Sequence, residues 1–489
     1  MKWNYVSLLI LSILLSYHIR SHAQLNGNNL AEFQYGQLPN DTSSISTLYD
    51  RLVLNYNYKW LKANATIEQF YSPIGNSSYV NLSQFSAYLR FKPFEFKVGN
   101  FYETIGRGLL LRSFEIPGAI LEDLSYRSRH YFNRDILGVS AKYNYKNFIT
   151  KLLYGRPLNY VFPPTQAFKY RRPDAIAAAY SEYSFKQQTM GLAAMQHSNG
   201  GIDKTYLMAT ASGNISHILS YYTELAKNVS DFGLSDFSNT ASYAFYSGLN
   251  FTKNNFGISA EYKNYKNFLI GSGINEPPAL VKEHSYKVLN RSTHVLQLLN
   301  ETGYQAELFY TFPNLSTLTF NNTLAINNFG QKFVFQEFFL EYDFSITENH
   351  EIKLFTDYAD DPFKLEKNRI SAGISTDSKI FEHSSFKTNY EFQTFERTGN
   401  DYQNHVLVLG YAFKSKFICN ITSEYSNDSF FVTTGSKIWV GANLKYQLNN
   451  NHSLQIFAGE RRGGPACNAG VCYEVLDFTG FEMRLTSRF

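Results

Sequence analysis

Apolar and polar residues alternate at every second position in segment after segment of this chain. In the segment 337–344, aromatic and aliphatic side chains occupy the even positions, while Glu337, Glu341 and Asp343 occupy three of the odd ones. The segments 416–425 and 437–446 alternate in the same way. A period of two is typical of a β-strand with one apolar and one polar face. The sequence therefore predicts an all-β protein.

The same alternation predicts about 24 strands, within a range of 22–26, from a first strand at 27–36 to a last at 478–489. Their length of about 9–12 residues suits a tilted membrane strand and exceeds the usual strand of a soluble protein. A soluble sandwich or propeller with its apolar face turned inward would alternate too. Strand length, an even strand count and the connectors favour a single transmembrane antiparallel up-and-down β-barrel.

The connectors between these strands fall into two groups on opposite sides of the barrel. With both termini in the periplasm, tight turns lie on the periplasmic side and long loops lie on the extracellular side. The tight turns are 92–93, 253–254, 313–314 and 449–451, and the long connectors are 106–133, 156–174, 227–240, 265–301 and 462–477.

The last eleven residues, TGFEMRLTSRF, make a strand that ends on an aromatic residue. Phe481, Met483 and Phe489 share one face, and charged residues share the other. A barrel has no free edge only if its last strand pairs with its first. We therefore expect this strand to close the barrel and to be recognised by the barrel assembly machinery through Phe489. Outer-membrane lipid and lipopolysaccharide would surround it.

Composition and charge narrow the class of protein further. The chain holds 37 Tyr and 42 Phe among 489 residues, which suits an apolar outer band with aromatic girdles. Its formal charge is only +4 and no basic block stands out, so no nucleic-acid partner is expected. Residues 1–23 carry Lys2, a short apolar run and small residues before Gln24, which predicts a cleaved signal peptide. The barrel would then occupy residues 24–489 and lie in the cell outer membrane.

Three blocks of sequence carry a resemblance to a known family. They are GNFYETIGRGLLLRSFE (99–115), ERRGGPACNAGVC (460–472) and the terminal FEMRLTSRF. The chain resembles an uncharacterised family of outer-membrane barrels found in Bacteroidota and their relatives. The resemblance implies an outer-membrane location and gives no substrate.

A barrel of this size would be roughly 45–50 Å across, so its lumen would be open unless something fills it. The segment 106–133 and its flanks combine glycines with dense opposite charge. We hypothesise that this loop folds into the lumen and forms a charged constriction, which would select solutes by charge. A surface loop with solvated charges is the alternative. The candidate constriction residues are Glu103, Arg107, Arg112, Glu115, Arg127, Arg129 and Arg134.

Strand alternation also predicts which charged residues line the lumen. These are Glu337, Glu341, Lys353, Asp357, Glu391, Lys445, Glu482, Arg484 and Arg488. Asp360 and Asp361 stand with Asp357 where a strand meets a loop, and they are expected to be solvated there rather than to bind calcium.

Two cysteines stand in the Gly-rich connector before the last strand. Cys467 and Cys472 are too far apart in sequence for a CxxC site and lack further zinc ligands, so a structural disulfide at the tip of this loop is expected. Cys419 lies on the predicted lipid face and reads as a small apolar residue.

These sequence features limit the functions that can be expected of the protein. No catalytic motif, cofactor site or metal site is evident, and no enzyme activity is expected. We expect a passive, porin-like channel for small polar solutes. The alternative is a non-conducting structural or assembly partner of surface or secreted proteins. The loops 156–174 and 265–301, rich in Tyr, Pro and charge, motivate that alternative because exposed aromatic residues suit protein contacts.

Overall fold

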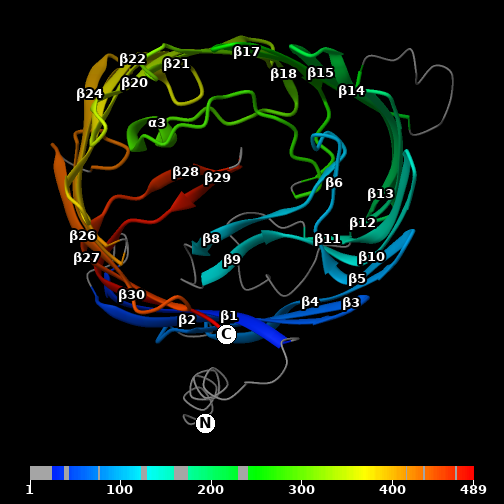
Figure 1. The fold of residues 1–489 in the computed structure, drawn as a ribbon, viewed down its shortest axis with the longest axis horizontal. Helices are drawn as coiled ribbons and strands as arrows, with labels where there is room; N and C mark the ends of the chain where they lie inside the picture. Colours follow the sequence, from blue (N-terminus) through cyan, green and yellow to red (C-terminus); the bar gives the residue numbers. More distant parts are fainter. Residues whose placement is uncertain are drawn as a thin grey trace.

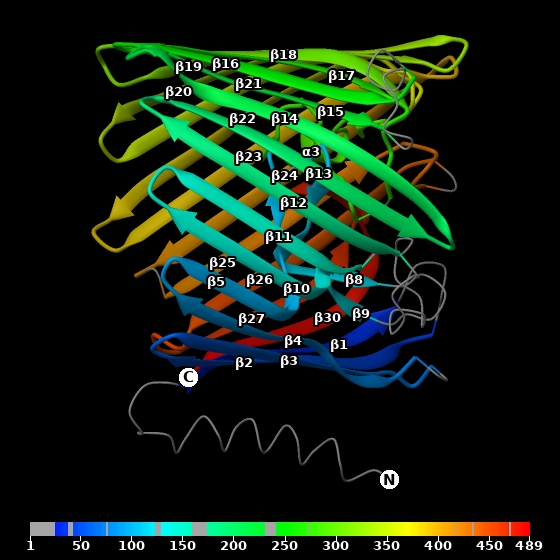
Figure 2. The same cartoon turned by 90° about the vertical axis from the view of Figure 1, so that its right-hand side faces the viewer.

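A computed structural model describes residues 25–37, 43–74, 77–122, 129–158, 174–229, 241–271, 273–414, 416–432, 435–468 and 471–489. Twenty-four antiparallel strands form one sheet that closes on itself (Figures 1 and 2). No helix in the described ranges is long and apolar enough to cross a membrane. The predicted antiparallel barrel and its strand number are confirmed.

Each barrel strand pairs with the neighbours that precede and follow it around the wall. The strands are β1 (Leu25–Gln37), β2 (Ile45–Tyr58), β3 (Leu61–Tyr71), β4 (Tyr79–Phe91), β5 (Phe94–Phe101), β10 (Ile136–Tyr145), β11 (Phe148–Pro157), β12 (Ala175–Phe185), β13 (Gln188–Asn199), β14 (Ile202–Ser216), β15 (Leu219–Asn228), β16 (Tyr243–Lys253), β17 (Phe256–Lys266), β18 (Asn300–Thr311), β19 (Thr317–Asn328), β20 (Lys332–Thr347), β21 (His350–Asp361), β22 (Glu366–Phe381), β23 (Ser384–Arg397), β24 (Asn400–Phe413), β25 (Phe417–Ser426), β26 (Lys437–Gln447), β27 (His452–Arg461) and β30 (Phe478–Arg488).

The first and last strands close the barrel as expected. β30 pairs with β1 from Asn28 opposite Arg488 to Gln37 opposite Thr479. Beyond the strand, the Gly27 and Phe489 backbones bond to each other in both directions, at 2.8 and 3.0 Å. Neither strand therefore leaves a free edge in this register.

The wall keeps the alternation read from the sequence. In β20, Phe338 and Leu340 are exposed on the outer face, whereas Glu337 and Phe339 are buried inside. A wall that shows apolar side chains outward and polar ones inward matches the pattern of a membrane barrel. Exposed rings also flank the tight turns of one rim, which gives that rim an aromatic girdle. They include Trp60, Phe91, Phe94, Tyr145, Phe148, Phe185, Phe381 and Phe413.

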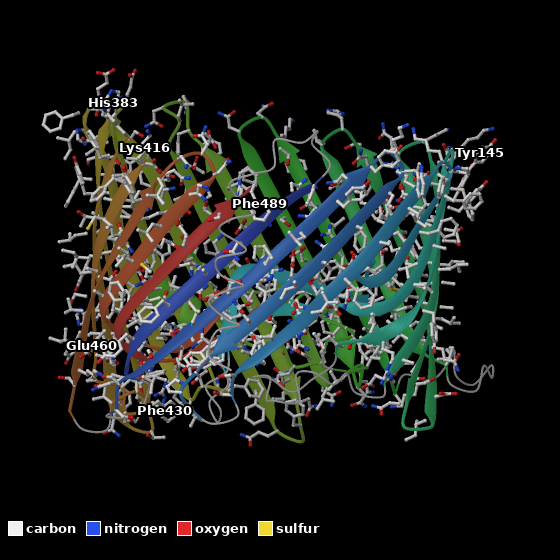
Figure 3. All side chains as sticks on the ribbon, turned by 90° about the horizontal axis from the view of Figure 1, so that it is seen from below. Tyr145, His383, Lys416, Phe430, Glu460 and Phe489 are labelled. Carbon is white, nitrogen blue, oxygen red and sulfur yellow. The ribbon has the colours of Figure 1, made fainter. Side chains whose placement is uncertain are left out.

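The two rims differ in their connectors, as predicted. The rim that carries Tyr145, His383 and Lys416 in Figure 3 holds the short turns, and we call it the short-turn rim. The first residue of β1 and the last residue of β30 lie on the same side of the barrel. The opposite rim, with Phe430 and Glu460, holds the long connectors and is called the long-connector rim. It also carries tight turns, at 200–201 and 398–399, which the expected division did not include.

Three connectors of the long-connector rim run inside the barrel (Figure 1). The first inward segment, 102–135, contains β6 (Thr104–Ile105), β7 (Leu111–Arg112), β8 (Phe114–Glu122) and β9 (Arg129–Arg134). The second, 267–299, contains the five-residue helix α3 (Lys287–Arg291). The third, 462–477, contains the ribbon β28 (Gly464–Asn468) and β29 (Val471–Val475).

Two expectations about these connectors were wrong. The loop 265–301 was read as an exposed protein-contact surface and 462–477 as an extracellular tip. Their described residues instead lie within the ring, and Tyr286 and Leu289 are 5% and 1% exposed. The cause is the wall, whose inner face carries aromatic residues that need apolar cover, as described below. Residues 159–173 of the other loop, like the predicted signal peptide, lie outside the described ranges.

Candidate functional site in the barrel lumen

Three leucines fix the first inward segment to the wall. Leu109, Leu110 and Leu111 are fully buried in an apolar cluster with inward-facing residues of β11–β17 and with the second inward segment. Burying each leucine side chain contributes about 1.5–3 kcal/mol. The inward fold of this segment, proposed from its glycines and charges, therefore also has a hydrophobic cause.

A glycine allows the chain to approach the wall closely just before these leucines. Gly106 has φ +60°, and a Cβ there would stand 2.1 Å from Oε2 of Glu224. The next backbone N–H, of Arg107, donates to that same oxygen at 2.9 Å. A residue with a side chain at position 106 would thus block the contact that holds the turn.

Two of the candidate constriction residues, Glu103 and Arg129, hold the segment in place. Glu103 lies 2.7 Å from Nζ of Lys151 and 3.1 Å from Nζ of Lys97. Burial raises the pKa of Glu103, but these two lysines outweigh it, so the pKa is lowered and the carboxylate stays charged. Buried Arg129 pairs with Glu32 of β1 at 2.7 Å. These charges act as anchors between the segment and the wall.

Two of the candidates have side chains exposed inside the barrel. Arg107 is exposed, and its guanidinium lies 4.9 Å from the ring of Tyr222. Glu115 is exposed too and accepts a 3.2 Å bond from the hydroxyl of Tyr102. Among the described residues of the segment, these two are the charged side chains that are most accessible to a solute. Of the other candidates, Arg112 is half-buried over Phe114, Arg134 is buried, and Arg127 lies outside the described residues.

A cavity of about 900 Å³ separates the first inward segment from the wall that includes the closing strands. Most of its lining residues are polar, and they include four cations, Arg51, Lys97, Arg484 and Arg488, and a single carboxylate, that of Glu115. The guanidinium of Arg51 lies 3.6 Å from the ring of Tyr131, and the hydroxyl of buried Tyr49 has no hydrogen-bond partner among the described residues. This is a solute-sized, polar space within the lumen.

Several of the predicted lumen-lining residues bind the second inward segment. The hydroxyl of Tyr286 donates to Glu341 at 2.6 Å, and the backbone N–H of Val288 donates to Glu391 at 2.9 Å. Glu482 accepts a 2.7 Å bond from Gln34. The remaining predicted residues stand nearer the short-turn rim: Lys353 lies between Asp343 and Glu351 at 2.9 and 3.1 Å, and Lys445 and Arg488 are exposed.

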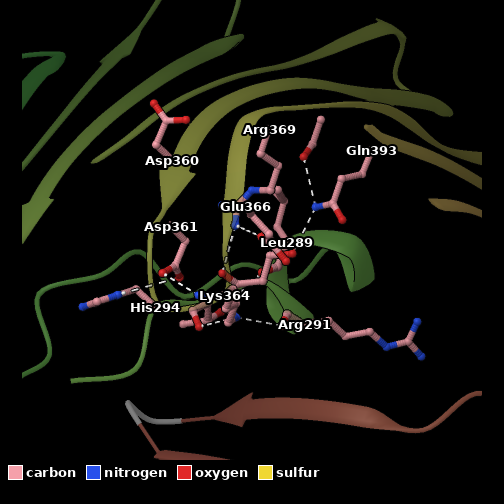
Figure 4. A network of polar contacts seen from close by, with 12 residues as sticks. Leu289, Arg291, His294, Asp360, Asp361, Lys364, Glu366, Arg369 and Gln393 are labelled. Atoms are coloured by element: carbon pink, nitrogen blue, oxygen red, sulfur yellow. Dashed lines mark hydrogen bonds and ion pairs between the residues drawn. The ribbon is translucent and has the colours of Figure 1, made fainter. Parts of the chain in front are cut away.

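A buried ionic network surrounds Arg369, which is 0% exposed (Figure 4). Its guanidinium lies 3.4 Å from Glu337, 3.7 Å from Asp357 and 3.0 Å from Glu366. It also donates to the backbone carbonyl of Ser292 at 3.1 Å, which ties the second inward segment to β22. Breaking such a buried network is costly because the remaining charges lose their partners.

The aspartate cluster differs from its prediction. Asp357 and Asp361 are each 1% exposed, whereas they were expected to be solvated. Asp361 lies 3.8 Å from Nδ1 of His294, and Figure 4 shows the two side chains pointing toward one another while Asp360 points away. The second inward segment covers this strand end, which is why water is excluded. Across the described residues, no group of three or more His, Cys, Asp or Glu is arranged to hold a metal ion.

Sequence reasoning missed the docking of the second inward segment. Tyr286 stacks on Phe355 with ring centroids 3.8 Å apart, and Phe339 joins the same cluster. Phe339 and Phe355 both occupy inward positions of their strands. Aromatic residues on the polar face of a barrel strand were the signal that could have predicted an apolar segment inside.

The third inward segment is held by the second. The Asn290 side chain donates to the carbonyl of Cys467 and accepts from its N–H, both at 2.9 Å. Cys467 stands opposite Cys472 in the β28–β29 ribbon. The side chain of Cys472 is outside the described set, so the disulfide stays a prediction. Cys419 is free and half-buried on β25.

The fold and lumen define an outer-membrane-type β-barrel with three connectors folded inside. The chain belongs to a family of unknown function, DUF6029, whose model matches residues 9–168 and 181–329, more than half of the chain. No curated protein matches it.

Solved structures share the architecture at very low identity. The chain resembles a mutant of the ferric enterobactin receptor PfeA of Pseudomonas aeruginosa with a TM-score of 0.50 and 10% identity, over 96% of this chain and 81% of that one. It also resembles the translocation pore of the P pilus usher PapC, with a TM-score of 0.49 and 10% identity over 95% and 99%. At this identity the likeness concerns the fold alone.

Proposed function

We propose that this protein is a passive outer-membrane channel for small polar solutes, narrowed by its three inward segments. The observation that carries the proposal is the polar cavity of about 900 Å³ between the first inward segment and the wall. Charged side chains that are exposed within the barrel, such as Arg107 and Glu115, supply the field that selects solutes by charge. Solute movement follows its gradient, and the proposal includes no enzymatic step.

The proposed orientation places the short-turn rim and both termini in the periplasm, with the long-connector rim outside. The pairing of β30 with β1 along the strand supports insertion by the barrel assembly machinery. Lipid and lipopolysaccharide are the expected surroundings of the exposed apolar wall. Protease treatment of intact cells tests the orientation, since a tag inserted at 200–201 should be cleaved and one inserted at 382–383 should be protected.

Liposome swelling tests the transport function. Vesicles that contain the purified protein should swell in isotonic solutions of small sugars and amino acids, and swelling should slow as the solute grows. Vesicles with protein inserted but no swelling for any solute smaller than the cavity would reject the channel.

A second function is supported by a different observation. The three inward segments bind one another. The backbone N–H of Arg112 in the first donates to the carbonyl of Ile274 in the second at 2.8 Å, and the second binds the third through Asn290 with Cys467 and through Arg291 with the carbonyl of Arg462 at 3.2 Å. A lumen filled in this way also suits a non-conducting partner of surface or secreted proteins. Purification from native membranes in mild detergent distinguishes the two, because a scaffold should bring a stoichiometric companion and a channel should not.

A further inference from the structure

A second, smaller cavity of about 260 Å³ lies where the second inward segment meets β22–β24 and the start of the third inward segment. Its wall combines four cations with four phenylalanines and only two carboxylates. The cations are Arg291, Lys364, Arg397 and Arg462, and the carboxylates are Glu366 and Asp428. This composition differs from that of the larger cavity, whose lining is mostly amides, hydroxyls and tyrosines.

The two carboxylates of this cavity are already engaged by one arginine. Arg397 lies 2.5 Å from Asp428 and 3.4 Å from Glu366, and its Nε donates to the carbonyl of Lys364 at 3.2 Å. A second cation, Arg291, is paired at 2.5 Å with Glu424, which lies outside the cavity lining. The positive charges of Lys364 and Arg462 are therefore not balanced by a carboxylate of the cavity.

Neither of these two cations has a carboxylate within ion-pair distance in the described part of the chain. Nζ of Lys364 donates only to the backbone carbonyls of Arg291 and Thr293, at 3.1 and 2.9 Å. Arg462 is 5% exposed and donates to the side chain of Asn404 at 3.0 Å, while its buried Nε has no hydrogen-bond partner among the described residues. Burial and the nearby Arg291 lower the pKa of Arg462 to about 10, yet it stays charged at neutral pH. A buried cation with an unused N–H favours an anion beside it.

Aromatic side chains hold the cations and form the mouth. The guanidinium of Arg462 lies 4.4 Å from the ring of Phe431, and that of Arg397 lies 4.0 Å from the ring of Phe430. Phe430 itself is 66% exposed at the long-connector rim (Figure 3), so the cavity is reached from that side. An exposed ring next to a charged pocket offers a stacking surface for a flat apolar group.

We propose that this cavity binds a small organic anion with a carboxylate on an aromatic ring. The carboxylate takes the N–H groups of Arg462 and the ammonium of Lys364, and the ring packs against Phe430 and Phe431. Drug-sized ligands occupy pockets of about 300–1,000 Å³, so the cavity of about 260 Å³ suits a single ring. The inference deepens the proposed channel function, because a site at the outer entrance would define a class of solute.

Isothermal titration of the full-length protein in detergent with sodium benzoate tests the site. Benzoate should bind saturably, and acetate and benzyl alcohol, which each lack one half of the ligand, should bind about tenfold more weakly or less. Benzylamine, of the same shape and opposite charge, should not bind. Absence of saturable benzoate binding, or equal binding of all four compounds, overturns the proposal.

Two variants assign the binding to this cavity. Arg462→Gln should weaken benzoate binding about tenfold or more, since it removes a charged donor. The matched control is Arg461→Gln, because Arg461 packs instead on Phe457 and Phe478 and does not line the cavity. Phe430→Ala removes a ring that is 66% exposed and leaves the ion pairs of Arg397 with Asp428 and Glu366 in place. This variant should therefore fold even if the arginine variant does not, and it should weaken the binding of benzoate but not that of acetate. Benzoate binding unchanged in both Arg462→Gln and Phe430→Ala would place the ligand elsewhere.

The titration measures binding and does not depend on conduction. The proposed anion site and the proposed channel can therefore be rejected independently of each other. Benzoate binding by a protein that does not conduct would keep this site and reject the channel. Conduction without benzoate binding would keep the channel and reject this site.

Discussion

Arg129 of the first inward segment and Glu32 of β1 form a buried ion pair, with Nη2 and Oε1 2.7 Å apart. Glu32 also pairs with Arg484 of β30, through its other oxygen. One carboxylate thus links the first inward segment to both strands that close the barrel. Docking of this segment and closure of the wall are therefore coupled.

Replacing Arg129 should loosen the first inward segment. In Arg129→Met the buried Glu32 loses one of its two cations, and breaking a buried pair costs about 3–5 kcal/mol. We expect faster limited proteolysis within 102–135 and a larger unit conductance. The control is Arg90→Met. Arg90 pairs with Glu95 at 3.1 Å, but the Arg90 side chain is 58% exposed, so this ion pair lies at the surface. Equal cleavage and conductance in both variants would contradict the anchoring role.

Removing one leucine of the first inward segment should lower stability without changing any charge. Leu110 is 0% exposed, so Leu110→Ala should cost about 2–5 kcal/mol from lost burial and the cavity left behind. The measurement is the urea midpoint of the protein in detergent, followed by tryptophan fluorescence. Leu315→Ala, at a turn residue that is 84% exposed, should leave the midpoint unchanged. A midpoint for Leu110→Ala equal to that of the control would mean the segment is not packed in this way.

Charge on the first inward segment should set ion selectivity. Arg107 is exposed within the lumen and Arg112 is half-buried, so replacing both with Ala should shift the reversal potential in a salt gradient toward cation preference. The same substitution at Lys59, in a turn of the short-turn rim, should have a smaller effect. Unchanged selectivity in the double variant would place this segment outside the conduction path.

Docking of the second inward segment should depend on pH through His294. Burial lowers the pKa of His294, but Asp361 and Glu301 outweigh it, so the pKa is raised above the ordinary value of 6.5. Protonated His294 therefore stabilises the folded protein fully below about pH 6.5, the pKa of an unperturbed histidine. This stabilisation is lost as the pH rises through the raised pKa of His294 in the folded protein. The urea midpoint of the wild type should exceed that of His294→Gln at about pH 6, and this gap should narrow toward about pH 9. His383→Gln, at an exposed turn, is the control; a gap that widens with pH would contradict the assignment.

Much of the wall could be predicted because a strand in a barrel wall obeys one local rule. Period-two alternation located every barrel strand, including the closing strand that ends beside Phe489, since each strand must present an apolar face to lipid. Three predicted boundaries were misplaced by four residues. The strand predicted at 94–105 ends at Phe101 in β5, because the chain turns into the lumen at Tyr102. The strand predicted at 367–377 extends to Phe381 in β22, and the one predicted at 404–414 begins at Asn400 in β24.

The lumen was less predictable because its contacts join residues far apart in sequence. The charges of 106–133 suggested an inward fold, but the partners of Glu103 and Arg129 lie on three different strands. Alternation alone shows that a phenylalanine faces the lumen. It does not show whether that side chain is exposed to solvent or, like Phe339, covered by a segment that is distant in sequence. For this reason the second and third inward segments were read as surface loops.

The central claim is that a solute path remains beside the three inward segments. Planar-bilayer recording of the purified wild-type protein tests it most directly. The account predicts discrete current steps on insertion, with a conductance below that of an unfilled barrel of the same strand number and an increase in Arg129→Met. Verified insertion with no current at any voltage, in the wild type and in the variant alike, would contradict it.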